Sequence, residues 1–377
     1  MIRSALSKIT CAVDSRLSAI IDEALSDMAI PEAFIQRAKQ VSFIERSGPF
    51  GLAARAALSE SRAELYRFYV PAGLESAAAR RVAEAADLYL PGRGTLFAED
   101  VEVLSAEALA YDESAISSAC EEGSCSRPLE HYSVLCCIVQ RGMGEDLART
   151  VLEMGLCVPI VSFGEGMGLR NKLGLLRITI PVDKEILYFV VPERDTALVE
   201  GVAVHKARLD KPGQGFIYRY QVRAYAVNLR VRAGKRSHAA SMEQVISVLD
   251  ELRGSSDWRR LEPVKGRATK GKAGSAASNL ACLSILAEEG SVGGFVRAAM
   301  DAGAGGATLV PLTRRRYDGF VEAGADLSSA REGCDLIIRT DLVEAVLGAV
   351  GRLGLFEGDA RGQAEISAVG HAVTYSA

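Results

Sequence analysis

Apolar and polar residues alternate with two different periods in the middle of the chain, and each period predicts a different kind of element. Short apolar runs rich in β-branched residues predict strands, whereas apolar residues three and four positions apart predict helices, one of which Gly155 would end. In chain order the predicted elements are strand 132–139, helix 145–154, strand 158–163, strand 186–191, helix 195–206 and strand 217–222. This is the βαββαβ order of the ferredoxin-like split motif.

The same order fits residues 8–103 and 280–373, and short sequence matches support an internal repeat. Between the first two copies the matches keep offsets of 120 or 121 residues: Val41–Phe43 with Val161–Phe163, Tyr66–Pro71 with Leu187–Pro192, and Leu88–Gly94 with Leu209–Gly215. The third copy is fainter, with offsets of 148 to 150: Gly155 with Gly303, Glu185 with Asp335, and Gly213–Gln214 with Gly362–Gln363.

These matches divide the chain into three modules and a linker. The predicted boundaries are module 1 at 1–115, module 2 at 130–253 with an added helix at 242–253, a flexible basic linker at 254–278, and module 3 at 279–377. We therefore predict an α+β fold of three ferredoxin-like modules, with antiparallel sheets and helices on one face. The three modules would assemble as an intrachain pseudo-trimer.

Composition narrows the function classes. Of the 377 residues, 49% are hydrophobic and 24% charged, which is typical of a globular protein, and the net charge of -4 gives no overall attraction to nucleic acid or an anionic membrane. No apolar stretch is long enough for a transmembrane segment and the N-terminus lacks a signal peptide's apolar core, so we expect a cytoplasmic protein.

Two segments of module 2 carry a family resemblance: GEGMGLRNKLGLLRITIPVDKEILYFVVP at 164–192 and LDKPGQGFIYRYQV at 209–222. They resemble the P-II signal-transduction family and its P-II-like relatives, in which the first segment is the base of a long loop and the second is a turn that holds nucleotide phosphates. The resemblance implies ligand-binding residues in three groups: Gly164, Gly166, Gly168 and Arg170 at the loop base, Lys211, Gly213 and Gly215 in the turn, and Arg230 and Arg232 as a phosphate clamp.

The turn also has a physical reason to bind an anion, because glycines let backbone N–H groups approach a phosphate closely. The opposing interpretation is a tight connection that needs positive φ angles. Phe216 stands where the family has a lysine. The first copy keeps Gly92 and Gly94 but has Leu90 in place of Lys211, and the third copy has lost the motif.

Two cysteines and two loops are further candidates. Cys120 and Cys125 lie in a polar turn after module 1. Two interpretations are open: a labile redox disulfide, similar to one in some P-II-like proteins, or two reduced thiols. The first copy's loop at 50–61 is alanine-rich and predicted to be helical. Residues 314–317 place three arginines and a tyrosine in the third copy's loop. This cluster suggests an anionic ligand or an acidic partner, and the alternative is a charged surface that contacts only solvent.

No enzyme or metal motif is found, so we expect neither catalysis nor a required cofactor. The expected function is a P-II-like sensor that binds a small anionic effector, ATP, ADP or AMP, at an inter-module cleft and regulates a protein partner such as a transporter or a metabolic enzyme. A monomeric pseudo-trimer is expected rather than a homotrimer. A scaffold of P-II-like modules without a ligand is the alternative, and an enzyme on a ferredoxin-like fold is a third possibility.

Overall fold

The structure is a computed structural model that describes most of the chain. The described residues are 1–46, 55–90, 92–107, 109–118, 128–168, 182–211, 213–228, 279–317, 329–357 and 362–374, without the side chains of 42–46, 55–59 and 130. The predicted linker at 254–278 and the predicted helix at 242–253 lie outside these residues.

Three stretches of the chain fold with the same order of elements. The first contains β1 (Ile2–Asp14), α1 (Ser18–Asp27), β2 (Glu32–Arg46), β3 (Arg55–Pro71), α2 (Glu75–Ala85) and β4 (Gly94–Ser105), followed by the short α3 (Glu113–Ser117). The second contains β5 (Leu129–Gln140), α4 (Gly144–Glu153), β6 (Ile160–Met167), β7 (Asp183–Pro192), α5 (Thr196–Ala207) and β8 (Gly215–Ala226). The third contains β9 (Leu280–Glu288), α7 (Val292–Asp301), β10 (Ala307–Arg316), β11 (Ala330–Arg339), α8 (Val343–Arg352), β12 (Gln363–Val369) and β13 (His371–Thr374).

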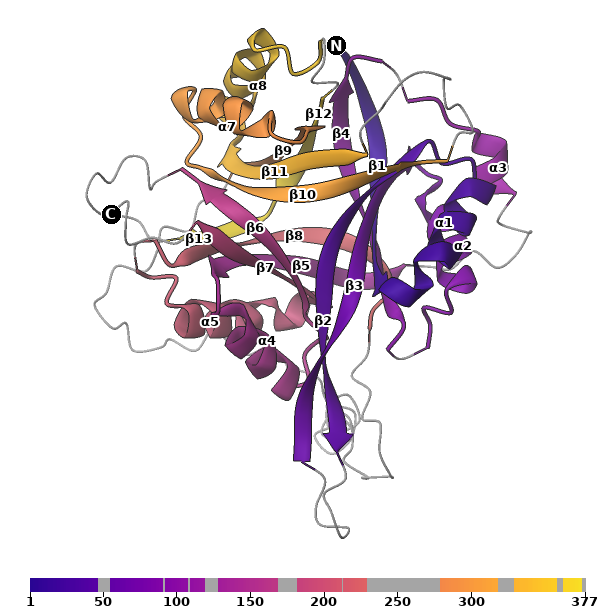
Figure 1. The fold of residues 1–377 in the computed structure, drawn as a ribbon, viewed down its shortest axis with the longest axis vertical. Helices are drawn as coiled ribbons and strands as arrows, with labels where there is room; N and C mark the ends of the chain where they lie inside the picture. Colours follow the sequence, from indigo (N-terminus) through magenta and orange to yellow (C-terminus); the bar gives the residue numbers. More distant parts are fainter. Residues whose placement is uncertain are drawn as a thin grey trace, which may run out of the picture.

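The strands are antiparallel and form one continuous 13-stranded sheet among the described residues. Within each stretch the first strand is central, paired with the third strand on one side and the fourth on the other, and the second strand pairs with the third. The structure is therefore α+β and consistent with ferredoxin-like modules. Figure 1 shows the helix pairs on the outside of the molecule and the strands between them.

The three stretches meet through equivalent strands. Their second strands, β2, β6 and β10, pair with one another, and the fourth strand β4 pairs with both β8 and β12. The C-terminal strand β13 then crosses to the second stretch and pairs with β8. The β2–β3 hairpin projects beyond the body of the molecule (Figure 1).

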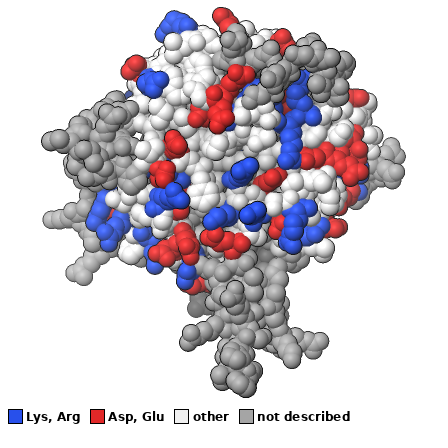
Figure 2. Space-filling view, in the orientation of Figure 1, with Lys and Arg blue, Asp and Glu red and all other residues white. Residues whose placement is uncertain are grey.

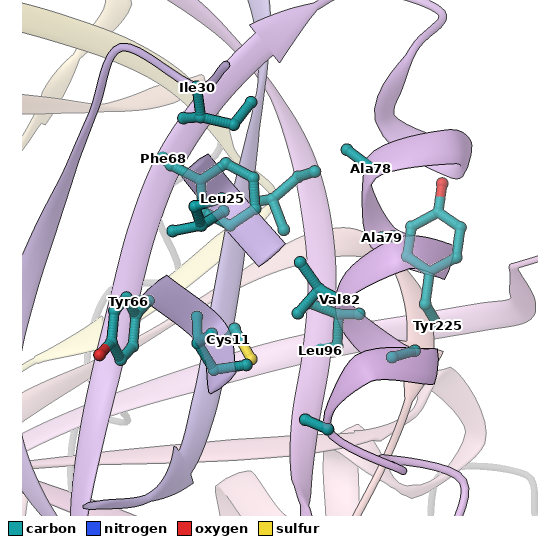
Figure 3. Close-up of a cluster of buried hydrophobic side chains, with 14 of the residues drawn as sticks. Cys11, Leu25, Ile30, Tyr66, Phe68, Ala78, Ala79, Val82, Leu96 and Tyr225 are labelled. Carbon is teal, nitrogen blue, oxygen red and sulfur yellow. The ribbon is translucent and has the colours of Figure 1, made fainter. Parts of the chain in front are cut away.

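Successive side chains of each strand point to opposite faces of the sheet, one toward the helices and one toward the centre of the molecule. In β1, Ile9, Cys11 and Val13 belong to the cluster that packs under α1 and α2, whereas Lys8 and Thr10 point to the opposite side, into the centre. Figure 3 shows this cluster, which we call the first core cluster. It includes Tyr225 of β8, whose hydroxyl lies 3.0 Å from Ser76 Oγ, so the second stretch contributes to the core of the first.

Two loop predictions are wrong. From Arg55 onward the alanine-rich segment predicted as helix is strand β3, because pairing with β2 overrides the helix propensity of its alanines. Residues 314–316 lie at the end of β10 and pair with β2. Arg315 binds Asp22 and donates to Tyr66 at 2.8 Å, so acidic groups of the first stretch already partner this cationic segment.

The predicted alignment of the third copy is also out of register. Gly155 and Gly303 do correspond, since both follow the first helix of their stretch with positive φ. Glu185, however, corresponds to Glu332 rather than to Asp335, because Glu185 lies opposite Val139 near the end of β5 and Glu332 lies opposite Ala287 at the equivalent place in β9. The error arises because the third stretch has a shorter loop between its second and third strands.

Over the described residues, no helix is long and apolar enough to cross a membrane. Figure 2 shows Lys and Arg interspersed with Asp and Glu on one face of the molecule. The ion pairs Arg3–Glu344, Arg141–Asp183 and Arg223–Asp100 are examples of this mixing.

The first core cluster gives a direct test of the packing. Phe68 is fully buried on β3, and we expect Phe68→Ala to lower the free energy of unfolding by about 3–5 kcal/mol through lost contacts and a cavity. Leu198→Ala on α5, where the side chain is 49% exposed, is the control and should change it by less than about 0.5 kcal/mol. Urea denaturation followed by circular dichroism measures both, and equal effects would contradict this core assignment.

Candidate functional site

The predicted phosphate turn connects α5 to β8. The helix ends at Arg208 in the left-handed conformation, the Lys211 amide donates to the Arg208 carbonyl at 2.9 Å, and Gly213 has a φ of 76°. The Lys211 side chain is exposed and Gly213 is half-buried. The turn therefore lies at the surface and places an exposed cation two residues from a glycine with positive φ.

Gly215 has a structural role. A Cβ at this position would lie 2.0 Å from the Ile138 carbonyl oxygen, because β8 starts here tightly against β5. Gly94 at the start of β4 would meet the Ala12 carbonyl oxygen at 2.5 Å. Gly362, just before β12, would meet the Leu286 carbonyl oxygen at 3.0 Å. By its place in the sheet, Gly362 is thus the counterpart of Gly215 and not, as the sequence alignment predicted, of Gly213.

The turn is bordered by the third stretch of the chain. Strand β13 pairs with β8 over four residues that begin immediately after Gly215, with Thr374 opposite Phe216. On the other side, Gln140 Nε2 donates to the Gly213 carbonyl at 2.9 Å and anchors the turn to β5. Among the described residues, none accepts a hydrogen bond from the Gly213 amide. The turn thus combines an available donor with a neighbouring stretch of chain.

The counterpart turn in the first stretch is occupied. Gly92, with a φ of 83°, donates its amide to Asn228 Oδ1 at 3.0 Å. Asn228 follows β8 and is itself buried. Its backbone amide donates to Thr95 Oγ1 at 3.1 Å. In the first turn, a side chain of the second stretch therefore occupies the glycine amide.

The loop-base glycines are used for packing between strands. Gly164 and Gly166 lie in β6, where β6 pairs with β10, and Gly168 follows with a φ of 142°. A Cβ on Gly164 would lie 2.5 Å from the Leu309 carbonyl oxygen, and one on Gly168 would lie 2.7 Å from Gly306 Cα. These positions are at the same end of the sheet as the turn, but β7 and β5 separate them, a span of about 14 Å at normal strand spacing.

Several predicted residues lie outside the described part of the chain: Arg170, Arg230, Arg232, Cys120 and Cys125. The other six cysteines are buried with free thiols. Burial raises the pKa of the Cys11 and Cys136 thiols to about 12, so both stay protonated at neutral pH and act as small apolar side chains. In the described residues no group of His, Cys, Asp and Glu is arranged to hold a metal ion.

The centre of the molecule contains a buried ionic cluster that the sequence did not indicate. Lys8 Nζ lies 3.0 Å from Glu99 Oε1 and also binds Glu365, which comes from β12. Tyr69 donates to Glu365 Oε2 at 2.9 Å, and Gln363 Nε2 donates to the Tyr69 hydroxyl at 3.0 Å. This network joins the first and third stretches.

The electrostatics of this cluster follow from burial. Burial raises the pKa of Glu99, because desolvation disfavours its charged form more than Lys8 favours it. For Lys8, burial by itself lowers the pKa, but Glu365 and Glu99 outweigh it and hold the pKa above its usual range. One cation therefore serves two carboxylates.

The sequence contained only a weak signal for these residues. Lys8 and Thr10 alternate with Ile9 and Cys11, a pattern that is typical of a sheet with one face in water. Only the meeting of the three sheets buries the polar side of that pattern.

Comparison with known proteins gives a limited result. No protein-family model matches the chain, and no curated protein matches it. Among solved structures, the chain is similar to the PII protein of Arabidopsis thaliana, crystallised with citrate, at 20% identity and a TM-score of 0.18. The match covers 29% of this chain and 92% of the plant protein.

The raised pKa of Glu99 predicts a pH dependence of stability. The folded state keeps the Glu99 proton to higher pH than the unfolded chain does, so this group's contribution is complete below its ordinary pKa of 4.5 and is lost as pH rises through the folded value. We expect the unfolding free energy of the wild type minus that of Glu99→Gln to fall as pH increases above 4.5. Urea titrations at several pH values measure it.

Glu102→Gln is the control for this experiment, because it removes an exposed carboxylate from the same strand and changes the net charge equally. A difference between wild type and Glu99→Gln that stays constant or grows with pH would contradict the assignment.

Proposed function

We propose that this protein is a P-II-like signal-transduction protein in which three ferredoxin-like modules of one chain form a pseudo-trimer. It would bind an adenine nucleotide beside Gly213 and Lys211, at the cleft between the second and third modules, and would regulate a protein partner. The available Gly213 amide next to the third module is the observation that carries this proposal.

The strand pairings support the pseudo-trimer. The glycine at the start of each fourth strand approaches the equivalent carbonyl of its central strand. Each third strand also has a glutamate at the equivalent register position, namely Glu64, Glu185 or Glu332. The modules also meet through their second and fourth strands. Three unrelated domains would have no reason to share this set of contacts.

The two described turns support a division of labour between modules. Asn228, which follows the fourth strand of module 2, binds the turn of module 1, whereas β13, which follows the fourth strand of module 3, borders the turn of module 2. In both cases, the residues that follow a fourth strand contact the turn of the neighbouring module. Only the first turn has its glycine amide occupied, so module 2 is the proposed nucleotide site.

A bound nucleotide would act through the two sides of its cleft. The phosphates would accept hydrogen bonds from the Gly213 amide and charge from Lys211, while β13 holds the third module in place. The base of the β6–β7 loop is paired with β10 of the same third module, so any shift of module 3 against module 2 reaches this loop. We propose that the loop presents the nucleotide state to a transporter or a metabolic enzyme.

Calorimetry tests the nucleotide site. We expect ATP, ADP or AMP to bind the wild type, and Gly213→Asp to weaken this binding by more than about tenfold, because its carboxylate repels phosphate at the turn. Lys211→Ala should weaken it less, since the exposed lysine contributes a screened charge.

Gly92→Asp is the matched control, because it places the same change in the occupied turn of module 1 and should leave nucleotide affinity unchanged. Thermal unfolding of each variant separates lost binding from lost folding. If no adenine nucleotide binds the folded wild type, the sensor proposal fails in this form and a ligand-free scaffold becomes the better explanation.

The pseudo-trimer predicts the size of the particle in solution. Because the three sheets already cover one another within one chain, we expect multi-angle light scattering to give a monomer of 40.2 kDa at all moderate concentrations. A stable particle of three times this mass would contradict the intrachain assembly.

A further inference from the structure

A small polar cavity lies where the three sheets meet, apart from the glycine turn. It has a volume of about 60 Å³ and is lined by side chains from all three modules. Arg67 of β3, Tyr188 of β7 and Asp335 of β11 occupy equivalent places in their modules, because each is the residue after the one paired with Cys11, Cys137 and Ile285 in the central strands. The centre is therefore surrounded by a cation, a neutral hydroxyl and an anion.

Arg67 has no carboxylate in contact among the described residues. Its guanidinium donates to Gln36 Oε1 at 2.8 Å and to the Tyr188 hydroxyl at 3.0 Å, both of which are neutral acceptors. Most of Arg67 is covered by protein, and the residue lines the cavity. A buried guanidinium whose contacts are all neutral is costly, and Asp335 and Glu365 offset this cost only from a distance, so an anionic group in the cavity would be its first direct counter-charge.

Asp335 is the opposite case. It accepts from Ser284 Oγ at 2.6 Å and from the Tyr218 hydroxyl at 3.5 Å, and no cation of the described residues lies within ion-pair distance. Like Arg67 it is only partly covered and lines the same cavity. The two opposite charges therefore face one cavity without touching each other.

The remaining charges of the cavity are already balanced among themselves. Lys8 is held between Glu365 and Glu99, and burial favours the neutral form of Glu99. This leaves Arg67 and Asp335 as the pair that can bind an occupant. Tyr220 of strand β8 lines the same cavity.

The size of the cavity limits the occupant. Its volume of about 60 Å³ has room for a few water molecules, since one water needs about 10–15 Å³ of such space. Pockets for drug-sized ligands have about 300–1,000 Å³, so a nucleotide does not fit here. The occupant must have few non-hydrogen atoms, with an anionic end for Arg67 and a cationic, hydrogen-donating end for Asp335.

We propose that the central cavity is a binding site for a small zwitterion of the size of glycine, with its carboxylate at Arg67 and its ammonium at Asp335. Charge complementarity favours this class over a simple anion, which Asp335 would repel, and over a simple cation, which Arg67 would repel. A homotrimer of identical subunits would place three like residues around this centre. The site thus depends on three non-identical modules in one chain.

The first experiment uses the wild-type protein and three probes: glycine, acetate and methylammonium. We expect glycine to raise the melting temperature in a concentration-dependent way and to give a saturable calorimetric isotherm, as a ligand of the native state must. Acetate and methylammonium should each bind at least about tenfold more weakly, because each satisfies one charge and opposes the other.

Two charge variants then test the orientation. Asp335→Asn leaves Arg67 unopposed, so preference should change from glycine to acetate. Arg67→Gln leaves Asp335 unopposed, so preference should change to methylammonium. A residue with a purely structural role would lower stability without reversing this preference. Arg141→Gln and Asp183→Asn, which break an exposed Arg–Asp pair, are the matched controls and should leave glycine binding unchanged.

The wild-type result stands by itself if a charge variant does not fold. The proposal is overturned if none of the three probes binds the wild type, or if the three bind equally and a crystal grown in glycine shows only water at Arg67 and Asp335. Gly213→Asp should retain glycine binding, so failure of the nucleotide site and failure of this site can be told apart.

Discussion

Each stretch contributes a four-stranded section to the continuous sheet, and the face of that section without helices is the constraint on which the architecture depends. A sheet with helices on one face must bury its other apolar face against something. Here the inner faces meet one another, and residues such as Leu65, Val134 and Cys282, one from each stretch, belong to a single shared cluster. The pairing of second strands with second strands, and of fourth strands with fourth strands, follows from bringing three such sheets together.

Burying three inner faces together also buries polar groups that would otherwise face water. Lys8, Glu99 and Glu365 satisfy one another, whereas Arg67 and Asp335 are bound to neutral partners and open into a cavity. Replacing such groups with apolar ones is often neutral or stabilising in other proteins, so their presence requires a reason. Fixing which stretch lies next to which would be one such reason, and binding the proposed small zwitterion would be another.

The glycines of the fourth-strand turns show how one residue type can have two roles. Gly94, Gly215 and Gly362 are required because a strand begins in close contact with a carbonyl of its neighbour. Gly92 and Gly213 instead have positive φ and offer an amide, which in the first turn is taken by Asn228. The difference between these turns lies in what the adjacent module provides and not in the glycine motif itself.

The sequence by itself determined the local elements, because strand and helix periods are set by side chains a few residues apart: the predicted strands at 132–139, 186–191 and 217–222 lie within β5, β7 and β8. It also located the turn at 211–215. Only the tertiary structure decided the register of the third stretch, the strand identity of the residues after Arg55, and the partners of Arg315. It alone placed Lys8, Arg67 and Asp335 at the centre, since Asp335 is about 270 to 330 positions along the chain from the other two and meets them only when the strands pair.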